Sequence, residues 1–80
     1  MNSSTRSDLE QLLLKRLAVI GDHALRERDA GEHLAQLRGA SEALDGFFHA
    51  HRAELPARLC HFLLQASYQK ALEYVREAAA

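Results

Sequence analysis

Apolar residues recur at alternating spacings of three and four along residues 30–55. The positions of this row are Leu34, Leu37, Ser41, Leu44, Phe48, His51 and Leu55. Such spacing places side chains on one face of an α-helix, in the a and d positions of a packed seam. We therefore predict a helix over about 30–54 and expect it to be the most enclosed element of the fold.

The rest of this segment is divided between a polar strip and small residues. The polar strip consists of Arg38, Glu42, Asp45, His49 and Arg52, and a small-residue row consists of Ala35, Gly39, Gly46, Ala50 and Ala53. Small side chains allow another helix to approach closely, whereas large ones fill a core. Neighbours are therefore expected on both flanks of this helix.

A second amphipathic pattern predicts a helix over about 8–28. Ser7 and Glu10 have the spacing of a capping box, which places its start after a flexible segment over residues 1–6. The main apolar row consists of Leu9, Leu13, Leu17, Ile20 and Ala24, and Leu12 and Val19 lie outside it. Two apolar residues stacked outside the main row indicate a second contact. Gly21 costs about 1 kcal/mol relative to alanine and marks either a close approach or a bend.

Two boundaries separate the predicted helices. Asp29 is a good N-cap and Gly31 a poor interior residue, which favours a break before residue 30, although a turn within one longer helix also fits. Leu55–Pro56 is a clearer boundary, because proline suits a first helical turn and pushes the preceding residue out of the α region. A third helix then follows over about 56–78.

The composition supports an all-α fold. Fourteen Leu and fourteen Ala stand against only four β-branched residues, and strands prefer the β-branched types. We predict one domain over residues 7–80, a small bundle of three long helices. A chain this short buries only about 60–65% of its unfolded surface, and its helices carry more apolar surface than such a bundle needs. A homodimer is therefore predicted to complete it, through Leu12, Val19, Leu34, Leu37, Ser41, Leu44, Phe48, His51, Leu55, Leu59 and Phe62.

Charge and cysteine content narrow the class of protein. The net charge is −1 with acids and bases interspersed, so no electrostatic footprint for nucleic acid is expected. No apolar run has the ~18 residues of a membrane span, and the N-terminus lacks the apolar core of a signal peptide. The single cysteine, Cys60, forms no intrachain disulfide and fits a reducing compartment. We expect a cytoplasmic protein without a cofactor.

Five histidines are the one anomaly of composition. Asp45 and His49 lie four residues apart, a spacing that suits metal ligands on a helix but also a solvated ion pair. His51 interrupts the apolar row and either fixes the register of the seam or ends it with the ring tip in water. His33 reads as a surface residue. Cys60 is expected to be a buried, inert thiol.

No catalytic constellation emerges from these residues. The sequence therefore favours a non-enzymatic module for protein–protein interaction, a homodimeric adaptor, chaperone-like or regulatory subunit whose partner is a second copy, another protein, or both. The alternative is a small metal-binding or enzymatic bundle that uses Asp45 and His49. A DNA-binding regulator ranks last, because the helices are long and the positive charge is diluted.

Overall fold

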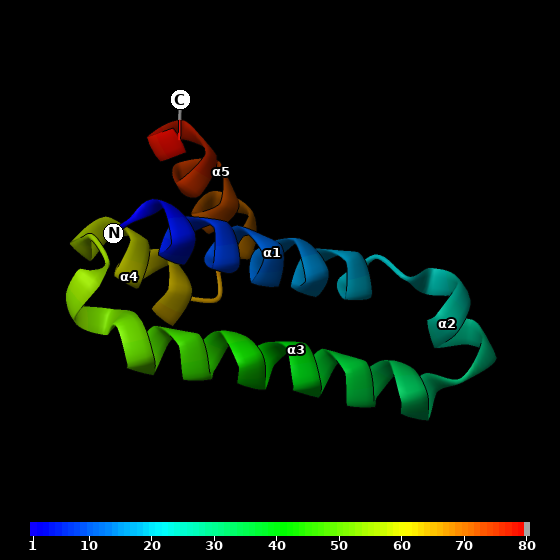
Figure 1. Ribbon diagram of the computed structural model, residues 1–80. Helices are drawn as coiled ribbons and strands as arrows, with labels where there is room; N and C mark the ends of the chain where they lie inside the picture. The colour runs from blue at the N-terminus through cyan, green and yellow to red at the C-terminus, as the bar shows by residue number, and fades with distance from the viewer. Residues whose placement is uncertain (80) are drawn as a thin grey trace.

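The computed structural model describes the backbone of residues 1–79 and the side chains of residues 1–78 (Figure 1). Within that part it contains only helices, which confirms the all-α class. The elements are α1 (Ser3–Ile20), α2 (His23–Arg28), α3 (Ala30–His51), a short 3-10 helix η1 (Arg52–Glu54), α4 (Ala57–Leu64) and α5 (Tyr68–Ala79). The prediction of three long helices is wrong, because the first and third are each divided in two. Ala80, the last residue of the predicted domain, lies outside the described residues.

The first predicted helix ends early, at Gly21. Two backbone bonds close α1 there, from Gly21 N–H to the Leu17 carbonyl and from Asp22 N–H to the Val19 carbonyl. The Asp22 side chain then accepts a hydrogen bond from Leu25 N–H at 3.0 Å and caps α2. A Cβ at Gly21 would meet nothing closer than 3.6 Å. The glycine therefore marks a break between two helices, not a close approach.

The third predicted helix is divided by a turn at residues 65–67 that contains no glycine or proline. Ala66 has a φ of 57°, in the left-handed region. Ser67 N–H donates to the Phe62 carbonyl at 2.8 Å, and Ala66 N–H donates to the Leu63 carbonyl at 3.2 Å. These two bonds form a Schellman motif, in which glycine usually takes the left-handed position. Because alanine takes it here, the sequence carries no visible signal for the end of α4.

Side-chain caps fix where two of the other helices begin. The Asn2 side chain accepts from Thr5 N–H at 2.8 Å and caps α1, so the predicted start at Ser7 is wrong. Asp29 caps α3 in the same way, which confirms the predicted break before that helix. The flexibility predicted for residues 1–6 stays a prediction.

The predicted boundary at Leu55–Pro56 is confirmed. Leu55 is extended, with φ −88° and ψ 138°, and follows the short helix η1. Pro56 has φ −59° and stands immediately before the first residue of α4. Proline suits this position because it has no N–H to leave without an acceptor at the start of a helix.

Helix α1 lies between α3 and the C-terminal helix α5. Figure 1 shows α1 and α3 side by side in opposite directions, joined by α2 at the end far from the N-terminus. α1 contacts α3 on one flank and α5 on another, and α4 contacts α5. The α4–α5 pair gathers toward the N-terminal end of α1 (Figure 1). The other end of the α1–α3 pair, near α2, therefore extends beyond it.

Helix α3 is less enclosed than expected. All five members of its small-residue row are exposed. A Cβ built at Gly39 or Gly46 meets nothing within 4 Å in the described chain. The expectation of neighbours on both flanks is therefore wrong within one chain, and any second neighbour must come from another molecule.

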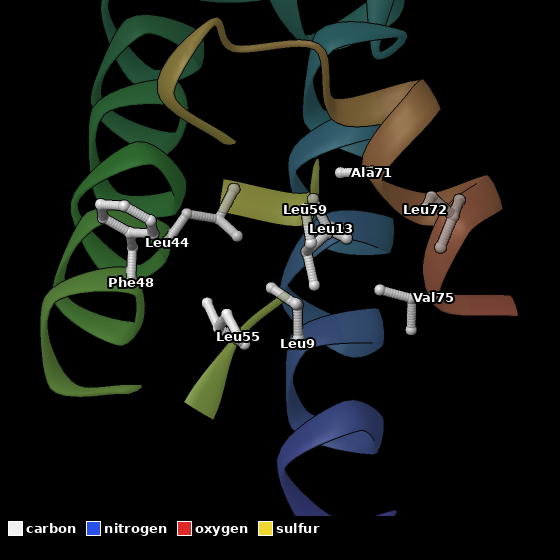
Figure 2. Packing of buried hydrophobic residues seen from close by; sticks show 9 residues of the cluster. All are labelled: Leu9, Leu13, Leu44, Phe48, Leu55, Leu59, Ala71, Leu72 and Val75. Carbon is white, nitrogen blue, oxygen red and sulfur yellow. The ribbon is translucent and has the colours of Figure 1, made fainter. Parts of the chain in front are cut away.

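The hydrophobic core forms where α1 meets the helices around it (Figure 2). Its members are Leu9, Leu13, Leu44, Phe48, Leu55, Leu59, Ala71, Leu72 and Val75. Four of them, Leu9, Leu13, Leu59 and Val75, are fully buried. Full burial of a large aliphatic side chain stabilises a fold by about 1.5–3 kcal/mol. Because these four come from α1, α4 and α5, they bind the C-terminal pair to the first helix.

A buried histidine joins the far end of the α1–α3 pair. His33, in the first turn of α3, places its Nε2 atom 2.8 Å from the Val19 carbonyl at the end of α1. A carbonyl only accepts, so this nitrogen carries the proton. The ring is buried, contrary to the surface position predicted for it. Its hydrogen bond gives the buried ring nitrogen a partner at the point where the chain reverses through α2.

Replacing Ala66 with glycine is expected to raise the free energy of unfolding by up to about 1 kcal/mol. Glycine avoids the penalty of about 1–2 kcal/mol that a Cβ imposes in the left-handed conformation. Part of that gain is lost, because glycine also raises the conformational entropy of the unfolded chain. Urea unfolding followed by circular dichroism measures the change. Ala35→Gly, at an exposed position in the interior of α3, is the control and should lose about 0.5–1 kcal/mol. A similar loss in Ala66→Gly would contradict the turn described here.

Candidate interaction surface

The predicted apolar row of α3 is covered along only half of its length. Leu44 is 3% exposed, and Phe48 and Leu55 are also buried in the core. Toward the other end, Leu34 is 56% exposed. Leu37 and Ser41 are half-buried between the two extremes. One continuous seam therefore passes from a closed core to open solvent.

The other predicted interface residues pack largely within the chain. Val19 is buried beside His33, and Leu59 is fully buried in the core. Leu12 and Phe62 are half-buried against the core. Their role in contacts with another molecule stays a prediction.

The apolar row of α3 becomes exposed beyond the turn that joins α4 to α5. Ala66 and Tyr68 line two neighbouring hollows, one beside α1 with Ile20 and one beside α3 with Ser41. The exposed apolar residues Ile20 of α1 and Leu64 of α4 thus border this turn. We call this surface the open face and define it by Leu17, Ile20, Leu34, Leu37, Ser41 and Leu64. Ile20 is 44% exposed and Leu64 is 66% exposed.

One part of the open face is a groove of about 390 Å³ between α3 and the α4–α5 turn. Leu44 and Phe48 form its floor on the α3 side, with Leu63, Leu64 and Tyr68 opposite. Glu42 and Asp45 line its outer edge and are exposed. We call it the acid-rimmed groove. Apolar concavities of this size with a few polar groups are typical of binding sites.

A second groove lies on the side of the small-residue row. Leu12 and Lys15 of α1 line it together with Gln36 and Gly39 of α3, and its volume is about 450 Å³. The small-residue row thus borders a hollow between two helices. Close approach of another helix is possible along this side, because no side chain stands in the way at Gly39 or Gly46.

Asp45 and His49, the two candidate metal ligands on α3, form a pair with each other. The Nε2 atom of His49 lies 3.5 Å from Oδ1 of Asp45, and both side chains are about two-thirds exposed or more. Within the described chain, no group of three or more His, Cys, Asp and Glu residues could hold a metal ion. A metal at this pair would need ligands from another molecule. The arrangement is an exposed contact between a histidine and a carboxylate, which contributes little to stability.

His51 ends the apolar row with its ring only partly in water. The ring lies against Phe47, with centroids 4.4 Å apart. Its Nδ1 atom is 2.7 Å from Oε2 of Glu54 in η1. The histidine thus links the last turn of α3 to the 3-10 helix. This contact fits the end of a seam better than a buried polar layer.

Cys60 and His61 do not form a catalytic pair. The Cys60 Sγ atom lies 3.8 Å from the Leu55 carbonyl and is half-buried against the core. His61 is exposed, and its ring lies beside Phe62. Neighbouring side chains on a helix diverge by about 100°. His61 is therefore not placed to act as a general base for this thiol.

Comparisons with known proteins give no information on the role of this surface. No protein-family model, curated protein or solved structure matches this chain. Among the described residues, no helix has the length and hydropathy needed to cross a membrane. The residues that sequence reasoning missed are Glu42 and Asp45 as a groove rim and Tyr68 as its wall, because the turn that brings them together has no sequence signal.

Proposed function

We propose that this protein is a non-enzymatic interaction module that binds another polypeptide on its open face. The observation that carries the proposal is the half-covered seam, in which Leu44 is buried and Leu34 is exposed on the same face of one helix. A periodic apolar row is expected to be covered along its whole length. Contiguous exposed apolar surface with a polar border is typical of interaction sites.

The proposed roles are those of an adaptor, a chaperone-like subunit or a regulatory subunit. Each of these binds a partner without changing it chemically. We place the protein in the cytoplasm, where the half-buried Cys60 thiol stays reduced. In this proposal Asp45 and His49 do not hold a metal ion.

Photo-crosslinking from the open face tests this function directly. Benzoylphenylalanine replaces Leu34 in one variant and Leu64 in another, and Gln11, exposed on α1, is replaced as the control. Irradiation in living cells followed by mass spectrometry is expected to give the same polypeptide from positions 34 and 64. Position 11 should give less of it by about tenfold, because contacts outside an interface core are sparse. Equal adducts from all three positions would contradict the proposed docking face.

A second copy of the chain is the candidate partner for the other side of α3. The exposed small-residue row and the hollow lined by Leu12 favour a close helix–helix contact there. A two-fold dimer through this side also fits the base rates for oligomers. It leaves the open face free, so self-association and partner binding are compatible.

Light scattering on a size-exclusion column tests the dimer. The expected mass is twice the 9.0 kDa of one chain, and chelator should not change it. The double variant Gly39→Leu and Gly46→Leu should fold, since both positions are open, and should elute as a monomer because the added side chains hold the helices apart. A monomeric parent protein, or a variant that remains dimeric, would contradict this contact.

A further inference from the structure

The acid-rimmed groove carries negative charge at its edge, which favours a positively charged occupant. Glu42 and Asp45 stand on its edge, three residues apart on α3, and both are exposed. No Lys or Arg within residues 1–78 lines the groove. In that same part of the chain, Glu42 has no ion pair, and Asp45 meets only His49, at 3.5 Å. Neither carboxylate is thus paired with Lys or Arg in that part of the chain, and both can meet a positive charge from outside.

Two arginines lie against the aromatic rings that line the groove. The Arg52 guanidinium carbon lies 5.5 Å from the centre of the Phe48 ring, and that of Arg16 lies 5.4 Å from the centre of the Tyr68 ring. Cation–π contacts of this kind are worth about 0.5–2 kcal/mol. They hold the two aromatic side chains that line the groove, and neither of these arginines forms an ion pair with Glu42 or Asp45.

We propose that the acid-rimmed groove binds an amphipathic helix of another protein, with leucine-like side chains beside Phe48 and Leu64 and with Lys or Arg facing Glu42 and Asp45. This inference rests on the proposed function and names its partner. Helix-in-groove recognition uses apolar anchors at spacings of three and four, with neighbouring charges for selectivity. Complementary charge also speeds association and rejects partners of the wrong sign.

Other occupants fit these charges poorly. A second copy that meets the groove through the same face would place Glu42 and Asp45 near the same acids of its mate, because a two-fold contact is self-complementary. Phosphates of nucleic acids and of anionic membranes would meet the same negative rim. A basic helix removes this repulsion and covers Leu64.

The test uses three synthetic helical peptides that share one apolar face. Their flanking positions carry Lys in the first peptide, Gln in the second and Glu in the third. Fluorescence anisotropy with the full-length protein measures binding. The Lys peptide should bind about fivefold more tightly than the Gln peptide, as two exposed ion pairs predict, and the Glu peptide should bind most weakly. The preference should shrink at high salt.

Matched variants assign the preference to the rim. Glu42→Gln with Asp45→Asn should bind the Lys and Gln peptides equally. Asp8→Asn with Glu27→Gln removes the same charge from other exposed positions and should keep the preference. Leu64→Asp should weaken binding of the Lys and Gln peptides.

The possible failures are distinguishable. Equal binding of all three peptides that Leu64→Asp abolishes would overturn the basic partner and leave the proposed function standing. A preference that survives in the rim variant would also overturn it. No binding of the Lys peptide would overturn the inference, and the crosslinks from Leu34 and Leu64 would then decide the proposed function by themselves.

Discussion

The burial of α1 between α3 and the C-terminal helices is the constraint on which this structure depends. Leu9 and Leu13 are fully buried, and the core that contains them also takes Leu59 from α4 and Val75 from α5. α1 contacts α3 on one flank and α5 on another. A chain of this size buries only about 60–65% of the surface that its unfolded form exposes. It therefore cannot cover every apolar side chain that it carries. The fold closes one end of the α1–α3 pair and leaves the other open.

The turn at residues 65–67 determines which end of the α1–α3 pair is covered. A single helix over 56–78 would run straight past the core, whereas the left-handed Ala66 folds α5 back against α1. The fold thereby gains Ala71, Leu72 and Val75 for its core, while Leu34 stays exposed. The same turn supplies Ala66 and Tyr68 to the acid-rimmed groove. Stability of the closed end and availability of the open face thus share one cause.

The sequence predicted the helical class, the cap at Asp29 and the boundary at Pro56, because each rests on local chemistry that the residue type reveals. It did not predict the division at Ala66, since alanine gives no hint of a left-handed conformation that only its hydrogen bonds stabilise. The seam along α3 was visible from periodicity alone. Which half of it is covered depends on where α4 and α5 pack, which is a tertiary property. The groove rim was missed for the same reason, since Glu42 and Asp45 belong to an ordinary polar strip until the turn faces them.

The half-covered seam is tested most directly by placing the same charge at its two ends. We would measure the free energy of unfolding of Leu34→Asp and Leu44→Asp by urea denaturation. At Leu44 the carboxylate is buried without a partner and should remove about 4 kcal/mol or more, enough to unfold much of the protein. At Leu34 it reaches water and should change stability by no more than about 0.5 kcal/mol. Equal losses at both positions would show that the whole seam is enclosed and would contradict the open face.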